Sequence, residues 1–228
     1  MIKLVCFDID DTLMDFHKGE EIAFYETMNQ VNVICNEQDY LDYKRINAGL
    51  WRALERNEIT KDKLKVHRFE LFKKENNKDF DSLSISQQYE LNLGKQCFLF
   101  ENAMDVVKKC YELCPLAITT NGISHIQRSR LKLSGLDKYF KYLFISEELK
   151  TQKPQKEYYE AIMNQSGCKP EEILIIGDSL SADILGAQNS GCKSVWYNPK
   201  HLENSLNLKI DYIIDDLNQI ITIVEENI

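Results

Sequence analysis

Four stretches of this sequence carry acidic, basic and hydroxyl side chains that could bind a cation and move protons. They are far apart along the chain, and each lies beyond a short apolar run: Asp8, Asp10 and Thr12; Thr120 and Asn121; Lys153; Asp178 and Asp183. Carboxylates gathered at one point repel one another unless a hard cation neutralises them, and Mg²⁺ takes protein carboxylates, water and substrate phosphate oxygens as ligands. If the fold brings these stretches together, the sequence predicts a magnesium site with a lysine beside it.

The apolar runs that precede these residues are typical of buried strands in a parallel sheet. They cover residues 2–7, 116–120, 142–145, 173–176, 194–197 and 212–214. Segments with helical periodicity follow the later runs or separate them, at roughly 103–112, 123–133, 155–166, 180–190 and 216–226. This alternation predicts a parallel sheet with helices on both faces. Ligands of such sheets bind outside the carboxyl ends of the strands, where the polar residues are expected.

Residues 16–95 interrupt this alternation. They contain no comparable strand run, and their apolar residues recur at helical spacing, as at Ile46, Leu50 and Leu54. The polar residues 75–79 fit a loop between two helices. This part of the chain is therefore predicted to be all-helical.

These elements predict an α/β protein of two domains. The first is a Rossmann-like parallel-sheet core made of residues 1–15 and 96–228, and the chain is expected to return to the sheet near residues 98–100. The second is the inserted helical domain, residues 16–95.

Composition and charge exclude several classes of protein. The 36 acidic and 28 basic residues give a net charge of −8, which disfavours polymeric nucleic acid and anionic membrane surfaces as partners. The seven cysteines are scattered without a metal-ligand spacing, so they are expected to be free thiols in a reducing compartment. No apolar run reaches the roughly 18 residues of a membrane span, and acids interrupt the first run at residue 8. We therefore expect a cytoplasmic protein.

Four motifs resemble those of the haloacid dehalogenase superfamily in chain order. They are FDIDDTL at 7–13, TNG at 120–122, KP at 153–154 and GDSLSAD at 177–183. A single DxDxT would be weak, since aspartates often cap helices and shape turns. Here each motif follows a predicted strand, and the set spans the predicted core. A helical insertion directly after the first motif also resembles the superfamily's subclass with a mobile four-helix cap, the C1 type.

The resemblance implies a Mg²⁺-dependent phosphomonoesterase that works through an aspartyl phosphate. Asp8 would be the nucleophile, and Asp10 would protonate the leaving group and then take a proton from the attacking water. The metal would be held by the Asp8 carboxylate, the backbone carbonyl of Asp10, and Asp178.

The remaining motif residues would bind substrate or support the site. Thr120, Asn121 and Lys153 would bind the transferring phosphoryl group. Thr12 would orient the first loop, and Asp183 would hold Lys153 or a metal-bound water in position. Two further acids match no required position and are expected to be a surface acid and a hinge residue: Asp11 and Asp15.

The substrate class follows from Asp10 and from the insertion. Displacing halide needs no proton, so an acid at position 10 favours a phosphatase over a dehalogenase. Residues 47–55 and 15–16 resemble the pyrimidine 5′-nucleotidase subgroup, which implies a nucleoside 5′-monophosphate as substrate. Trp51 could then stack on the base, although a core position in the helical bundle is the alternative, and Asn47 could touch substrate or be a solvated helix residue.

Other functions of the same residues stay open. A sugar-phosphate phosphatase, a phosphomutase and a phosphonatase with a lysine in the insertion are the enzymatic alternatives. A phosphate-sensing module without turnover is the alternative outside enzymes. The expected partner of the chain is a small phosphate ester.

Overall fold

The computed structural model describes all 228 residues, which form two compact units. One unit contains Met1–Phe16 and Cys97–Ile228, and the other contains His17–Gln96. Each boundary between the two units lies one residue further along the chain than the boundary predicted from the sequence. No helix combines the length and the apolarity that a membrane span needs.

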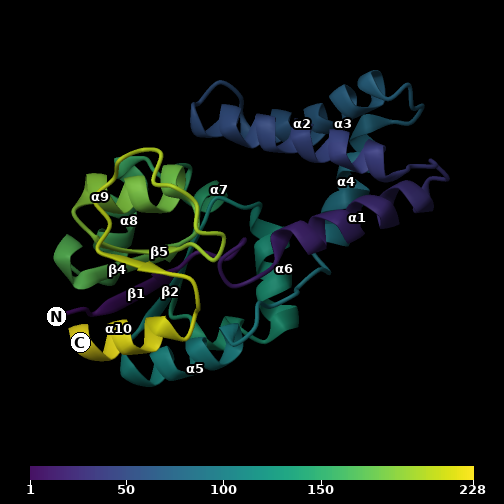
Figure 1. Cartoon of the computed structure of the whole chain (residues 1–228). Coiled ribbons are helices and arrows are strands. Elements are labelled where there is room, and N and C mark those ends of the chain that lie inside the picture. The colour runs from purple at the N-terminus through teal and green to yellow at the C-terminus, as the bar shows by residue number, and fades with distance from the viewer. The chain divides into compact units, whose positions relative to one another are not determined.

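The first unit is built on one six-stranded parallel sheet, as predicted (Figure 1). Its strands are β1 (Leu4–Phe7), β2 (Leu116–Thr120), β3 (Tyr142–Ile145), β4 (Ile173–Gly177), β5 (Lys193–Tyr197) and β6 (Tyr212–Ile214). They lie in the order β3-β2-β1-β4-β5-β6. The chain adds β2 and β3 on one side of β1 and then β4 to β6 on the other. The direction of winding therefore reverses at β1, the position where α/β sheets bind ligands.

Helices connect these strands and cover both faces of the sheet (Figure 1). They are α5 (Ala103–Leu113), α6 (Ser124–Ser134), α7 (Ser146–Leu149), α8 (Lys156–Ser166), α9 (Leu185–Ser190) and α10 (Gln219–Asn227). Short helical turns cover Asp137–Tyr139 and Pro170–Glu172, and a π-helical turn, Leu180–Ile184, precedes α9. The helix predicted at 180–190 therefore begins with a π-helical turn and continues as an α-helix only from Leu185.

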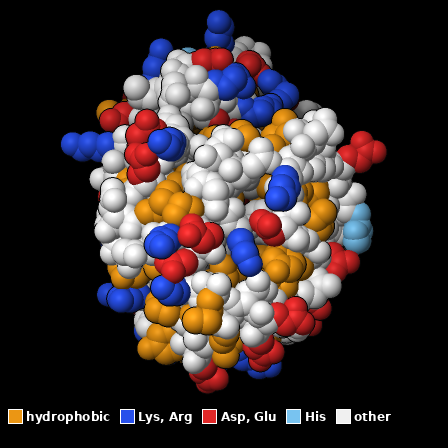
Figure 2. All heavy atoms as spheres, turned by 90° about the vertical axis from the view of Figure 1, so that its left-hand side faces the viewer, with side chains coloured by type: hydrophobic (Ala, Val, Ile, Leu, Met, Phe, Trp, Pro, Cys, Tyr) orange, Lys and Arg blue, Asp and Glu red, His pale blue; other side chains and the backbone are white.

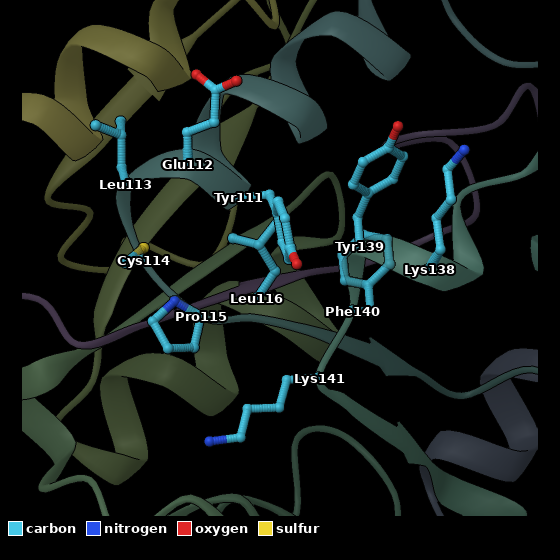
Figure 3. A pocket seen from close by; sticks show the side chains of 10 residues that line it. All are labelled: Tyr111, Glu112, Leu113, Cys114, Pro115, Leu116, Lys138, Tyr139, Phe140 and Lys141. Carbon is cyan, nitrogen blue, oxygen red and sulfur yellow. The ribbon is translucent and has the colours of Figure 1, made fainter.

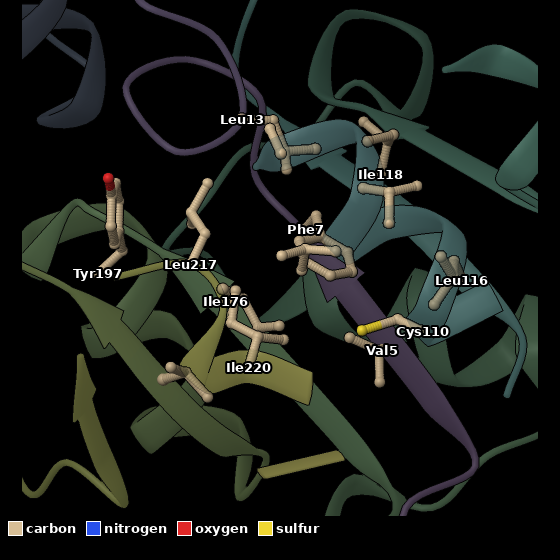
Figure 4. Packing of buried hydrophobic residues seen from close by; sticks show 14 of the residues in the cluster. Val5, Phe7, Leu13, Cys110, Leu116, Ile118, Ile176, Tyr197, Leu217 and Ile220 are labelled. Carbon is tan, nitrogen blue, oxygen red and sulfur yellow. The ribbon is translucent and has the colours of Figure 1, made fainter. Parts of the chain in front are cut away.

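Alternate residues of β1 divide the core into two layers. Val5 and Phe7 pack with residues of α5 and α10, among them Cys110 and Ile220 (Figure 4). Leu4 and Cys6 face the opposite side, where the cluster includes residues of α8 and α9. Because both faces of the strand are buried, its sequence is a continuous apolar run rather than an alternating one.

The return of the chain to the first unit differs from expectation. Residues 98–100 do not add a strand to the sheet, since Leu99 forms only an isolated bridge with Met14. The backbone N–H of Asp15 donates to Phe98 O at 2.9 Å, and that of Phe100 donates to Leu13 O at 3.0 Å. The backbone groups of the returning segment are thus satisfied by the loop after β1 rather than by a sheet edge.

The second unit contains four helices around an aromatic core. They are α1 (Phe16–Gln30), α2 (Glu37–Glu55), α3 (Lys61–Glu75) and α4 (Ser82–Leu93). The ring of Tyr43 lies 4.8 Å from that of Phe24 and 5.4 Å from that of Phe69, between centroids. Side chains of Asn36, Thr60 and Asp81 cap α2, α3 and α4, because each accepts from an otherwise unpaired N–H of the first turn.

One face of the surface carries side chains of both charges (Figure 2), and the cysteines are free thiols. On the face that Figure 2 shows, acidic and basic side chains are interspersed among apolar ones. The net charge of −8 is therefore not gathered into one field on this face. All seven cysteines are free, and three are buried: Cys6, Cys110 and Cys192.

Candidate active site

The carboxyl ends of β1 and β4 bring three carboxylates together. Asp8 directly follows β1, and its backbone N–H donates to Ile176 O of β4 at 2.9 Å, which continues the pairing of these strands. Asp178 directly follows β4, and Asp183 lies in the π-helical turn after it. Oxygens of the three carboxylates lie within 4.8 Å of one another. The predicted acidic residues of the first and fourth motifs therefore meet at the switch point of the sheet.

Lys153 lies inside this carboxylate cluster. Its ammonium donates to Asp8 Oδ1 at 2.6 Å, Asp183 Oδ1 at 2.6 Å and Thr119 O at 2.9 Å. All three N–H donors are used, and the residue is only 2% exposed. Burial disfavours the charged form, but the carboxylates of Asp183 and Asp8 outweigh it and raise the pKa of Lys153 well above its usual value. The side chain is therefore a fixed positive charge.

The charge of the cluster suits a hard cation. Burial raises the pKa of Asp8 well above its usual value although Lys153 opposes the shift. Burial, assisted by the charge of Asp183, raises the pKa of Asp178 to about 7. One ammonium faces three carboxylates here, so negative charge is in excess when all three are ionised. An all-oxygen donor set with excess negative charge fits a divalent cation such as Mg²⁺.

A close backbone approach places Asp183. A Cβ on Gly177 would lie 2.2 Å from Asp183 Cγ, so only glycine leaves room for the carboxylate. The backbone N–H of Ser179 donates to Asp183 Oδ2 at 3.2 Å, which leaves Oδ1 for Lys153. The indole N–H of Trp196 on β5 donates to Asp178 O at 2.8 Å and fixes the neighbouring turn.

Asn121 joins the second motif to the third. Its Nδ2 donates to Lys153 O at 3.0 Å, and its Oδ1 accepts from Lys153 N at 2.9 Å. Both ends of the amide thus hold the backbone of Lys153. The sequence predicts only a substrate-binding role for Asn121, and this contact with the backbone of Lys153 is not apparent from it.

Thr120 is oriented by its surroundings. Its Oγ1 accepts from Gly122 N at 3.0 Å and from Gln127 Nε2 at 3.0 Å. With two bonds accepted, the hydroxyl hydrogen is left to donate. Thr120 is buried at the carboxyl end of β2, beside the carboxyl end of β1.

Asp10 has two partners outside the four motifs. Its Oδ1 accepts from Arg130 Nη1, and its Oδ2 accepts from Gln127 Nε2 at 2.6 Å. Both partners lie on α6 and are 1% exposed. The signal in the sequence is their spacing, because Gln127 and Arg130 occupy the helical face on which Ile126 and Leu131 are buried. Polar residues at core positions of a helix indicate a buried polar contact.

The rest of the first motif is also engaged. Thr12 is fully buried, and its hydroxyl donates to Asp178 Oδ1 at 3.3 Å, which ties the first motif to the fourth. Asp11, expected to be an idle surface acid, is half-buried with a left-handed backbone, φ 57°. Its Oδ1 accepts from the backbone N–H of Phe16 at 3.2 Å, so it caps the start of α1. The Phe16 ring in turn lies 5.9 Å from the Arg130 guanidinium carbon.

The two candidate residues of the insertion differ in exposure. Asn47 is 2% exposed rather than solvated; it donates to Glu20 Oε1 at 2.6 Å and accepts from Arg68 Nη1 at 3.4 Å. A ligand of Asn47 would have to compete with these bonds. Trp51 is half-buried and is not part of the fully buried core, so some of its ring surface is accessible.

A separate pocket lies at the other end of the sheet. Its volume is 560 Å³, and Tyr111, Leu116, Lys138 and Lys141 are among the residues that line it (Figure 3). Leu116 begins β2 and Lys141 immediately precedes β3, so this pocket opens at the amino ends of the strands. It contains none of the motif residues and is not part of the candidate active site.

The fold and the site define a class of α/β proteins with an acidic, lysine-containing centre at the switch point and a helical insertion after the first strand. The chain belongs to the haloacid dehalogenase-like hydrolases, whose family model matches residues 5–197. The prediction from the four motifs is therefore confirmed.

Three known proteins illustrate the similarity. The chain is 37% identical over 229 aligned residues to pyrimidine 5′-nucleotidase PynA of Streptococcus pneumoniae, covering 99% of this chain and 96% of that protein. It is 28% identical to pyrimidine 5′-nucleotidase YjjG of Escherichia coli, covering 95% of each chain. The crystal structure of the putative HAD-hydrolase YfnB of Bacillus subtilis, bound to magnesium, has a TM-score of 0.92 and 35% identity, covering 98% of each chain. The predicted resemblance to the pyrimidine 5′-nucleotidases is confirmed.

Proposed function

We propose that this chain is a Mg²⁺-dependent phosphomonoesterase that hydrolyses nucleoside 5′-monophosphates through an aspartyl phosphate. The observation that carries the proposal is the position of Asp8, which is held by Lys153 within a carboxylate cluster at the switch point. The names of the two nucleotidase relatives support the substrate class.

The first half-reaction transfers the phosphoryl group to the protein. Asp8 Oδ attacks phosphorus in line, the bond from phosphorus to the ester oxygen breaks, and Asp10 gives its proton to the departing alkoxide. In the second half-reaction a water attacks the phosphorus of the aspartyl phosphate, and Asp10 takes a proton from that water. Inorganic phosphate leaves, and Asp8 is regenerated as a carboxylate.

The groups around Asp8 stabilise charge on the transferring phosphoryl. Lys153 supplies a fixed positive charge beside the nucleophile. Thr120 has a hydroxyl hydrogen left to donate to a phosphoryl oxygen. Preorganised donors of this kind typically contribute about 10²- to 10³-fold each to the rate. Asn121 acts on the reaction through the backbone of Lys153.

Mg²⁺ would be held by the Asp8 carboxylate, the backbone carbonyl of Asp10 and the Asp178 carboxylate. When bound, it would neutralise the phosphate dianion so that an anionic nucleophile can approach phosphorus. Asp183 is close enough to belong to the same cluster, but both of its oxygens are engaged, Oδ1 by Lys153 and Oδ2 by the backbone N–H of Ser179. We therefore assign Asp183 to the positioning of Lys153, and Thr12 to the positioning of Asp178.

We also assign the two units their roles by this proposal. Met1–Phe16 with Cys97–Ile228 is the catalytic core, and His17–Gln96 is the cap that selects the leaving group. In the cap, the accessible ring surface of Trp51 is suited to stacking on a base. Asn47 is the weaker candidate because its amide is already bonded at both ends.

A substrate panel tests the proposal. Phosphate release would be measured from pyrimidine and purine nucleoside 5′-monophosphates, sugar phosphates and p-nitrophenyl phosphate, with Mg²⁺ and with EDTA. We expect turnover of the nucleotides that EDTA abolishes and that Asp8→Asn removes while the protein stays folded. Turnover of sugar phosphates alone would replace the nucleotidase assignment, and interconversion of phosphate positions without release would indicate a mutase. Activity that EDTA does not change would contradict the proposed requirement for Mg²⁺. If no ester is hydrolysed, the alternative of a phosphate-sensing module without turnover is favoured.

A further inference from the structure

We propose that Arg130 is a positioning residue for the reaction, which with Gln127 holds the carboxylate of Asp10 in the orientation that proton transfer needs. The inference rests on the proposed function, since Asp10 moves a proton only if the chain cleaves a phosphate ester. Both residues lie on α6, outside the four motifs.

The contacts from α6 hold both oxygens of Asp10. Arg130 Nη1 donates to Oδ1, and Gln127 Nε2 donates to Oδ2 at 2.6 Å. A carboxylate bound at both oxygens by two different side chains cannot rotate about its last bond without losing one of them. The plane of the carboxylate is therefore set by α6 rather than by the loop that carries Asp10.

The same contacts orient the amide of Gln127. Arg130 Nη1 donates to Gln127 Oε1 at 3.0 Å, so the NH₂ end of the amide faces Asp10. That NH₂ group also donates to Thr120 Oγ1 at 3.0 Å. Arg130 thus determines which end of Gln127 meets Asp10.

Stability alone is a poor explanation of this arrangement. Arg130 is 1% exposed, whereas the side chain of Asp10 is 28% exposed. A buried charge loses its hydration, and well-packed apolar residues are often as stabilising as a buried ion pair. Unlike an apolar contact, the ion pair fixes the orientation of the Asp10 carboxylate while leaving that carboxylate partly accessible to a ligand.

The hold on Asp10 leaves room for the proton. Each carboxylate oxygen has two lone pairs, so an oxygen that accepts one hydrogen bond keeps a site for a proton. The proton passes from that oxygen to the ester oxygen as the phosphorus–oxygen bond breaks, and the orientation of the carboxylate decides how well the two oxygens are aligned.

The dependence of the rate on the leaving group separates this role from a structural one. A nucleoside or phenol needs a proton as it departs, whereas p-nitrophenolate does not. The quantity to measure is kcat/KM, because it covers only the steps up to departure of the leaving group. We expect Arg130→Lys to lower kcat/KM for phenyl phosphate about 10- to 100-fold, and that for p-nitrophenyl phosphate less than about 3-fold.

Two further variants sharpen the test. Gln127→Met loses the donors to both Asp10 and Thr120. It should therefore lower kcat/KM for both substrates, and the decrease should be larger for phenyl phosphate. The matched control is Arg128→Lys on the same helix, an exposed residue that pairs with Glu148 at 2.8 Å, which should leave both rates unchanged.

A double-mutant cycle decides the outcome. In an Asp10→Asn background, adding Arg130→Lys should change kcat/KM less than about 2-fold, since nothing remains to be positioned. Thermal unfolding would confirm that each variant is folded. Equal losses for both leaving groups, or full additivity in the cycle, would overturn the positioning role. A wild-type protein that hydrolyses no ester would instead overturn the proposed function on which the role rests.

Discussion

The ammonium nitrogen of Lys153 lies 2.6 Å from Oδ1 of Asp8, and both side chains are buried. The two residues are far apart in the sequence, and they meet because Asp8 follows β1 while Asn121, after the neighbouring β2, clasps the backbone of Lys153. The nucleophile of the proposed reaction is therefore paired with a positive charge before substrate binds.

Replacing Lys153 by Met should remove activity more than it alters binding. The variant leaves the buried Asp8 carboxylate without its ammonium, and we expect kcat to fall about 10²- to 10³-fold. Removing one partner of a buried ion pair costs about 3–5 kcal/mol, so the free energy of unfolding should also fall. Steady-state kinetics and urea unfolding measure the two effects. The exposed Lys132→Met is the control, and a Lys153→Met enzyme with wild-type kcat would remove this residue from the mechanism.

Replacing Gly177 by Ala should destabilise the core and displace Asp183. The new Cβ would lie 2.2 Å from Asp183 Cγ, an overlap that costs about 1–3 kcal/mol on relaxation. Gly49→Ala in α2 is the contrasting control, because nothing lies within 4 Å of its Cβ and alanine favours a helix by about 1 kcal/mol. Urea unfolding should therefore give opposite signs. Equal stability for Gly177→Ala and wild type would contradict the close approach.

The contribution of Asp178 to the stability of the metal-free protein should decrease as the pH rises from 4 to 7. Burial raises the pKa of Asp178 from 3.8 to about 7, so in this range the folded state binds a proton that the unfolded state has released. A cation competes with that proton. Added Mg²⁺ should thus raise the unfolding temperature more at pH 8 than at pH 6, as calorimetry with and without EDTA would show.

The control for this pH dependence is Asp178→Asn, which removes this titrating group and should reduce both effects, although Asp8, whose pKa burial also raises, remains. A magnesium-induced shift in unfolding temperature that is the same at pH 6 and pH 8 in the wild type would argue against Asp178 as a ligand.

Replacing Trp51 by Ala should weaken nucleotide binding selectively. Stacking on a base is worth about 1–3 kcal/mol, so we expect KM for a nucleoside monophosphate to rise roughly 5- to 150-fold. The kcat/KM for p-nitrophenyl phosphate should change little. Arg45→Ala, an exposed residue on the same helix, is the control. A parallel loss for both substrates would return Trp51 to a packing role.

The strands could be predicted well because burial on both faces makes each one a continuous apolar run. The run at 116–120 coincides with β2 to the residue. The prediction that the chain returns to the sheet at residues 98–100 was wrong. An apolar run does not tell whether its backbone pairs with a sheet or with a loop. The π-helical turn at Leu180–Ile184 is equally invisible in the sequence, because apolar periodicity does not resolve one wider turn.

The meeting of the acidic residues could be predicted because parallel strands end at one edge of the sheet. The particular contacts that hold them could not be predicted, because they depend on the direction of each side chain, which neither strand order nor helical spacing gives. Gln127 and Arg130 are polar residues on a buried helical face, and Asn121 turns toward the backbone of Lys153. Asn47 is buried by partners on α1 and α3, which helical spacing within α2 does not reveal.

Gly122 lies in the turn after β2 and Gly177 is the last residue of β4, and neither has a positive φ. An alanine at Gly122 would meet Gln127 Nε2 at 2.2 Å, just as one at Gly177 would meet Asp183. At each position the glycine has no Cβ, and a polar side chain from the following helical segment occupies the space that a Cβ would fill. Variation at either position would disturb that inserted group before it strained the peptide chain, so the damage would reach the reaction centre first.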